Sequence, residues 1–152
     1  MYNILIAFLL VILLILIPVV VVSIIAYWKL FTKAGEKGWK ALIPLYSTYT
    51  MYKLTWKPMF FWVMLGIGIV DNLLIRINNT TLQNISWLFT AALIVVSVIF
   101  LVNLAKSYGK GVGFAIGLIF LNPIFLLILA FGSSQYIGPM GVATKEEPVE
   151  AP

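Results

Sequence analysis

The sequence predicts an all-α integral membrane protein with four transmembrane helices and an amphipathic interfacial segment between the first and the second. Hydrophobic residues make up 62% of its 152 residues and charged residues 10%, with a mean hydropathy of +1.08. Soluble domains do not have this composition. The length suits one small transmembrane domain, predicted over residues 1–137 and followed by a flexible acidic tail at 138–152.

Four apolar stretches are predicted to span the membrane. The first contains no charge and, at about 1.5 Å per residue, reaches roughly 37 Å, more than the ~30 Å hydrocarbon core. Pro58 suits the start of the second, because the first turn of a helix leaves its N–H groups unpaired anyway. Lys106 ends the third. The predicted spans are residues 4–28, 58–77, 87–105 and 112–131.

The segment 29–57 separates the first two spans and carries six lysines and one glutamate, a net charge of +5. Its aromatic residues recur at spacings of three and four, interrupted near Pro44, as expected for a helix lying at the membrane interface. A docking surface for another protein is the alternative interpretation. The residues expected at the interface or at lipid headgroups are Lys29, Lys33, Lys37, Trp39, Lys40, Tyr46, Tyr49, Lys53, Trp56 and Lys57.

The basic loops predict the orientation in the membrane. Lys106 and Lys110 add a second basic loop, whereas the polar segment 78–86 is uncharged. Four spans would place both basic loops on one side. The positive-inside rule assigns that side to the cytoplasm, so both termini are expected outside, with loops 29–57 and 106–111 in the cytoplasm.

Polar residues inside predicted spans are candidates for a functional site. Asp71 is the one acid expected in the hydrocarbon region, where an unpaired charge is costly. Asn122 and Pro123 interrupt the last span, where the proline frees a backbone carbonyl. Asp71 and Asn122 are expected at similar depths, so they could meet either as a structural hydrogen bond or as an ion, proton or ligand site. Small residues expected to allow close helix packing are Gly68, Gly113 and Gly117.

The sequence lacks the residue types that several kinds of catalytic and metal site require. The sequence has no cysteine and no histidine. Outside the predicted tail the only acids, Glu36 and Asp71, are expected at different depths, which argues against paired acid and base catalysis. We therefore expect no enzyme, no catalytic residues, no cofactor and no metal site. The positive charge lies between apolar spans, which argues against nucleic-acid binding.

The segment F-T-K-A-G-E-K-G-W-K-A-L-I-P-L-Y at residues 31–46 resembles the signature K-A-G-x-x-G-W-x-x-L-I-P-x-Y of a bacterial and archaeal family of small multi-pass membrane proteins of unknown function. A similar module precedes the catalytic domain of some signal peptidase I proteins. The ending L-A-F-G-S-S-Q-Y-I-G at residues 129–138 also looks similar to that module. The resemblance implies location in a prokaryotic cytoplasmic (inner) membrane but no peptidase activity, since the chain offers no Ser/Lys dyad in a soluble domain.

Three functions remain open. The first is a non-enzymatic accessory or interaction subunit of a larger membrane assembly, with a membrane-protein partner or a second copy and with anionic lipid headgroups at the basic loop. The second is a small oligomeric transporter or channel that uses Asp71 and Asn122. The third is an immunity protein against membrane-active peptides. Recovery of a stoichiometric partner would favour the first, and solute flux lost in Asp71→Asn the second.

Overall fold

The computed structural model describes residues 2–77 and 80–143, and every regular element in these ranges is helical. This confirms the all-α prediction. The predicted tail at 138–152 lies mostly outside the described residues. The elements are α1 (Tyr2–Lys33), η1 (Gly38–Leu42), α2 (Pro44–Thr55), α3 (Met59–Arg76), α4 (Thr80–Ser107), α5 (Val112–Phe120), α6 (Asn122–Phe131) and η2 (Pro139–Gly141).

The K-A-G-x-x-G-W signature is a helix end followed by a tight connection. Gly35 has a φ of +76°, a left-handed conformation that glycine adopts at little cost, and it lies just beyond the last residue of α1. The Glu36 N–H donates back to the Phe31 carbonyl at 2.8 Å, as in a helix C-cap. At Gly38 an added Cβ would overlap the indole of Trp28, so the second glycine permits close approach to α1.

Among the described residues three helices, not four, are long and apolar enough to cross a membrane, and the prediction of four spans is wrong. The candidate spans are Ile4–Lys33, Met59–Arg76 and Asn84–Ser107. The predicted span 112–131 is two short helices, α5 and α6, joined at Leu121. At about 1.5 Å per residue each is roughly half as long as the ~30 Å hydrocarbon core is thick.

The chain reverses direction at Leu121, which has φ −127° and ψ 47°. The ring of Phe125 folds back onto α5, where a Cβ at Gly117 would overlap it and where the Phe114 ring lies 5.0 Å away. Residues eight apart on one straight helix would be about 12 Å apart along the axis. Pro123 starts α6 rather than kinking a longer helix, since a proline in the first turn costs no hydrogen bond.

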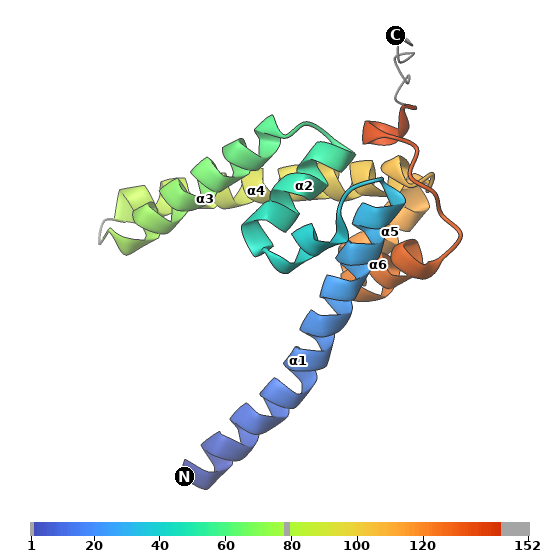
Figure 1. Ribbon diagram of the computed structural model, residues 1–152. Coiled ribbons are helices and arrows are strands. Elements are labelled where there is room, and N and C mark those ends of the chain that lie inside the picture. Colours follow the sequence, from blue (N-terminus) through green and yellow to red (C-terminus); the bar gives the residue numbers. More distant parts are fainter. Residues whose placement is uncertain (1, 78–79, 144–152) are drawn as a thin grey trace.

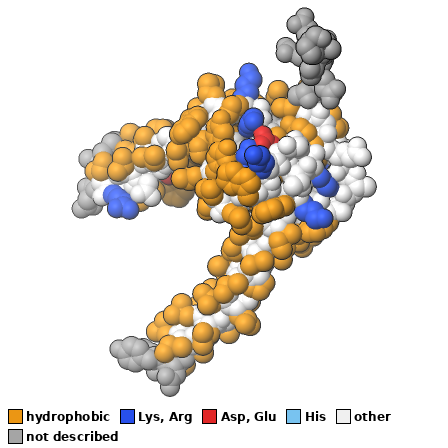
Figure 2. Space-filling model, in the orientation of Figure 1, with side chains coloured by type: hydrophobic (Ala, Val, Ile, Leu, Met, Phe, Trp, Pro, Cys, Tyr) orange, Lys and Arg blue, Asp and Glu red, His pale blue; other side chains and the backbone are white. Residues whose placement is uncertain are grey.

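The helices form a packed head and two arms (Figure 1). We define the head as α1 from Ile24 onward, η1, α2, α4 from Phe100 onward, α5, α6 and residues 132–143. The main cluster of buried hydrophobic residues lies in it, whereas Phe61 is buried on α3. One arm is the N-terminal part of α1, and the other is the hairpin of α3 with residues 80–99 of α4. Figure 2 shows both arms covered mainly by hydrophobic side chains, with most Lys and Arg side chains on the head.

Candidate functional site

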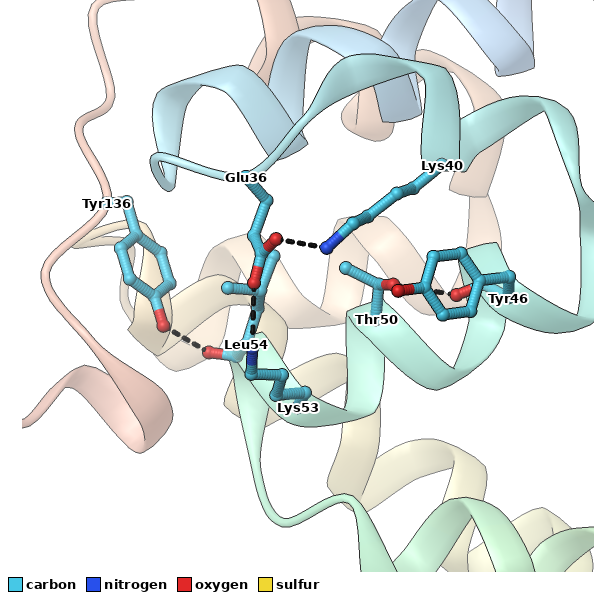
Figure 3. Close-up of polar contacts among 7 residues, drawn as sticks. All are labelled: Glu36, Lys40, Tyr46, Thr50, Lys53, Leu54 and Tyr136. Carbon is cyan, nitrogen blue, oxygen red and sulfur yellow. Dashed lines mark hydrogen bonds and ion pairs between the residues drawn. The ribbon is translucent and has the colours of Figure 1, made fainter.

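Glu36 is the centre of an ionic cluster in the head (Figure 3). Its two carboxylate oxygens accept hydrogen bonds from different lysines, Oε2 from Lys40 of η1 and Oε1 from Lys53 of α2, the latter at 2.8 Å. The Glu36 side chain is 17% exposed. The cluster therefore ties the connection after α1 to both following helices.

The charge of Glu36 is stabilised by these contacts. Hydrogen bonds from Lys40 and then from Lys53 hold the pKa of the Glu36 carboxyl below its ordinary value, and they outweigh the desolvation that would raise it. In turn the hydrogen bond to Glu36 raises the pKa of Lys40. Both groups therefore stay ionised across the physiological pH range.

Two tyrosines fasten distant segments to the head. The Tyr108 hydroxyl donates to the Leu30 carbonyl of α1 at 2.9 Å, and the Tyr136 hydroxyl donates to the Leu54 carbonyl of α2 at 2.7 Å. Their rings meet edge to face at 5.4 Å. Burial raises the pKa of both phenols, that of Tyr136 to about 12, with a further contribution from the charge of Glu36. Both tyrosines thus remain neutral hydrogen-bond donors.

Lys33 caps the C-terminus of α6. Its Nζ donates to the carbonyls of Leu129 and Gly132, both at 2.8 Å, and approaches Ser134 Oγ at 3.5 Å. A cation is favourable at this position because the last carbonyls of a helix are unpaired and carry partial negative charge. The contact holds the end of α6 against the last turn of α1, about a hundred residues away in sequence.

A cavity of about 460 Å³ lies where α1 and α2 diverge, and we call it the fork cavity. Its walls are mostly apolar, with hydroxyl groups from serine, threonine and tyrosine. Phe100 of α4 also lines the cavity. The remaining lining residues are Val19, Val20, Ser23, Ile24, Tyr27, Ala41, Leu42, Pro44, Ser47, Thr48, Met51 and Tyr52.

The predicted interfacial aromatic residues form a series of ring contacts that runs from η1 through α2 to α3. Trp39 stacks on Tyr46 at 5.9 Å, and Tyr46 stacks on Tyr49 at 6.3 Å. Tyr49 then meets Phe61 and Trp62 at the start of α3. Tyr46, Tyr49 and these α3 rings line an apolar cavity of about 370 Å³.

The other predicted interfacial residues lie around the head. Trp56 stacks on Phe60 at 3.6 Å, at the start of α3. Lys29 is exposed and lies over the ring of Phe131, 5.1 Å from its centre. Lys37 and Lys57 are exposed.

Asp71 and Asn122, which could have formed one intramembrane site, lie apart. Asp71 accepts hydrogen bonds from Ser86 and, at 3.4 Å, from Thr90, both on α4. Asn122 opens α6, which packs against α1 and α5, whereas α3 packs against α4 and α2. No hydrogen bond joins these two described residues. Sequence reasoning missed Ser86 and Thr90, because Ser86 was assigned to the polar segment before the third span; α4 begins at Thr80, and a spacing of four then places both residues on one helix face.

The three predicted packing glycines differ in their surroundings. A Cβ at Gly68 or at Gly113 would meet no atom within 4 Å, so neither helix approaches another closely there. Gly117 is the exception, since it accommodates the ring of Phe125. Within residues 2–77 and 80–143, no three acidic, histidine or cysteine side chains lie close enough together to hold a metal ion.

The model of a family of unknown function, DUF5684, matches residues 39–139. The chain belongs to this family. The match begins at Trp39, inside the glycine signature, and ends at Pro139, so it includes α2 to α6 and both tyrosines that fasten the head. No curated protein and no solved structure matches the chain.

Proposed function

We propose that this protein is a non-enzymatic accessory or interaction subunit of a larger assembly in the cytoplasmic membrane of a prokaryote. The observation that carries the proposal is the divergence of the two arms from the head, beside the fork cavity. α1 packs against η1 and α6, whereas α3 packs against α4 and α2. The arms leave the head in different directions (Figure 1), and the fork cavity lies between α1 and α2.

The occupant we propose for the fork is an apolar transmembrane helix of a partner protein. No residue of the α1 arm from Ile4 to Ser23 is buried. The cavity combines apolar side chains with small hydroxyl residues, and helix interfaces in membranes favour such residues because they permit close approach and hydrogen bonds. Ser23 already donates to the Val19 carbonyl at 2.7 Å, which keeps its hydroxyl paired until a partner binds.

The number of crossings changes the proposed orientation. Ile137 N–H donates to the Ser107 carbonyl at 2.8 Å, and a Cβ at Gly141 would contact the Lys106 backbone. The described C-terminal segment therefore lies at the end of α4 that carries the basic loop. With three crossings and the positive-inside rule, we place the basic end of the head and the described C-terminal segment on the cytoplasmic side and the N-terminus outside, in place of our expectation of two outer termini.

The two alternatives have less support. The transporter interpretation needed Asp71 and Asn122 together, and each has different neighbours. No feature of the head or of the arms favours the immunity interpretation over the accessory role. The resemblance to the membrane part of some signal peptidase I proteins suits an accessory role, because such a module would position another domain or partner at the membrane.

Adjacent valines of α1 provide the test. Val20 lines the fork cavity and is 47% exposed, whereas Val21 is 48% exposed and does not line it. A photo-crosslinking amino acid is placed at each position in the full chain, expressed in its native membrane. We expect one discrete adduct from position 20, containing the same membrane protein that copurifies stoichiometrically in mild detergent, and little from position 21.

Val20→Trp should fill the cavity and abolish copurification of that protein, while Val21→Trp should not. Equal crosslinking at both positions, or crosslinks to lipid alone, would contradict the proposal. Solute flux by the reconstituted protein that is lost in Asp71→Asn would instead support the transporter.

A further inference from the structure

A second groove runs along α1 beside α6 and adjoins the fork cavity at Val19 and Ser23, which line both. It has a volume of about 190 Å³. It is lined by residues of α1 and α6, namely Pro18, Val19, Val22, Ser23 and Ala26 with Pro123 and Leu127. Nearly all of this lining is hydrocarbon. The groove could therefore accommodate an apolar chain but offers almost no partner for a polar one.

One end of this groove is cationic. Val22, Ala26, Lys29 and Lys33 recur at spacings of three and four, so they share one stripe of α1. Lys110, which precedes α5, is close enough to Lys33 for their charges to interact, as is Lys29. Lys29 lies over Phe131 at 5.1 Å and Lys110 over Phe114 at 5.9 Å, which brings both ammonium groups to the α5–α6 hairpin.

No protein carboxylate in the described chain balances these three charges. The only acids before residue 145 are Glu36 and Asp71. Glu36 is occupied by Lys40 and Lys53, and Asp71 lies in the α3–α4 arm with Ser86. Lys33 uses its donors on carbonyls of α6, so among the described residues its positive charge has no carboxylate counter-ion.

We propose that this groove binds one anionic phospholipid, with an acyl chain along α1 from Val22 toward Pro18 and the phosphate between Lys29 and Lys110. The distance along α1 from Pro18 to Lys29 is about 16 Å, close to the ~15 Å depth of one leaflet. Charge and shape are therefore both complementary to a molecule with an anionic head and an apolar tail. The bound lipid fills the gap beside the short α5–α6 hairpin and neutralises the cluster.

The lipid site shares Val19 and Ser23 of α1 with the fork cavity, but its other wall is α6, whereas the fork cavity is closed by η1, α2 and α4. It also differs from general attraction of lipids to the basic loop. General attraction depends on the number of lysines in the head, whereas this site depends on the two lysines at the groove.

The first experiment measures which lipid the full chain retains in detergent. The purified protein is mixed with equal amounts of phosphatidylglycerol and phosphatidylcholine of identical acyl chains, and bound lipid is counted by native mass spectrometry. We expect one phosphatidylglycerol per chain. The double variant Lys29→Gln/Lys110→Gln should retain it about tenfold less, because two charge-assisted contacts to the phosphate are lost.

The matched control is Lys37→Gln/Lys57→Gln, which removes the same charge from exposed positions of the head. It should retain the lipid like the unaltered chain. Equal retention of the two lipids, or equal loss in both double variants, would overturn the proposal in favour of nonspecific attraction.

The second experiment tests the apolar part of the groove. Val22→Trp should block the acyl chain and reduce retention, whereas Val21→Trp, a neighbouring exposed position outside the groove, should not. A third arm replaces the lipid by inorganic phosphate at the same concentration. Thermal stabilisation by phosphate equal to that by phosphatidylglycerol would overturn the lipid assignment, and so would undiminished retention in Val22→Trp.

Discussion

The side chains of the head and those of the arms make different kinds of contact. In the head, contacts join residues far apart in the chain: Lys33 to the end of α6, Tyr108 to α1, and Tyr136 to α2. In the arms, Ser23 and Ser97 bond to carbonyls four residues away. Asp71 with Ser86 is the principal polar link between the two helices of the hairpin arm.

This difference shows that hydropathy and packing are separate properties of the sequence. The α1 arm is more apolar than the head, yet none of its residues from Ile4 to Ser23 is buried. In a bilayer such a surface needs no protein partner to be stable, because lipid tails are as apolar as leucine. The fixed part of the fold is therefore the head, and the arms are the surfaces available to lipid and to partners.

The sharpest test of this division is which side of the membrane each part faces. The sequence contains no cysteine, so single cysteines can be introduced without background. We expect Lys37→Cys and Ala143→Cys to react with a membrane-impermeant maleimide from the same side, and Thr80→Cys from the other. The result is all or none, because an unprotected thiol is either accessible or separated by the bilayer.

Labelling in right-side-out and inverted vesicles gives the absolute orientation. If Ala143→Cys is labelled from the same side as Thr80→Cys, and not from the side of Lys37→Cys, then α5 and α6 cross the membrane as one span. That outcome would contradict the three-crossing arrangement and support the four spans expected from hydropathy.

The next largest effect is expected at the cap of α6. Lys33→Met keeps the apolar stem but removes the ammonium, so the carbonyls of Leu129 and Gly132 lose charge-assisted hydrogen bonds. We expect the free energy of unfolding to fall by about 3 kcal/mol, measured by denaturant titration in detergent. Lys37→Met, four residues further along and exposed, is the control and should change it by less than about 0.5 kcal/mol. Equal effects of the two variants would mean that Lys33 does not cap α6.

The sequence predicted the helical class and three of the spans because these depend on local hydropathy. It also predicted the interruption of the interfacial segment near Pro44, where η1 ends and α2 begins. The fourth span was wrong because an apolar window averages over a reversal. Asn122 and Pro123 marked the position of the break, but whether a proline kinks one helix or starts another depends on what the chain packs against.

The candidate site was less predictable than the fold. Tyr108 and Tyr136 hold the head together through bonds to residues 78 and 82 positions away, and no periodicity reports such contacts. The bond from Lys53 to Glu36, across 17 positions, is equally invisible to a local pattern. A tyrosine at the end of an apolar helix is equally typical of a membrane interface. The lysines were found because charge is rare in this chain, but sequence did not separate Lys33, a cap, from Lys29, an exposed cation.

Glu36→Gln tests the ionic cluster by its dependence on pH. Because Lys40 and Lys53 lower the pKa of Glu36 in the folded state, its stabilisation is fully present above the ordinary pKa and is lost as pH falls through the folded value. We expect the unaltered chain to be more stable than the variant by about 1 kcal/mol at pH 7. The difference should shrink below about pH 4.5, the usual range of a glutamate.

Thermal unfolding in detergent at pH 7 and pH 3.5 measures this difference. Other carboxylates titrate equally in both proteins, so they cancel. A stability gap that stays constant with pH would contradict the role of the charged Glu36.

The smallest effect is expected in the hairpin arm. Asp71→Asn keeps an oxygen that can accept from Ser86, so we expect the free energy of unfolding to change by less than about 1 kcal/mol. Ser86→Ala, which removes the donor, should lower the free energy of unfolding by about as much as Asp71→Ala does. The double variant should lower it little further, because both substitutions remove the same interaction. Crosslinking at Val20 should be unchanged in Asp71→Asn, since the fork cavity does not include α3. A loss of partner binding in this variant would show that the arm, and not only the head and its fork, recognises the partner.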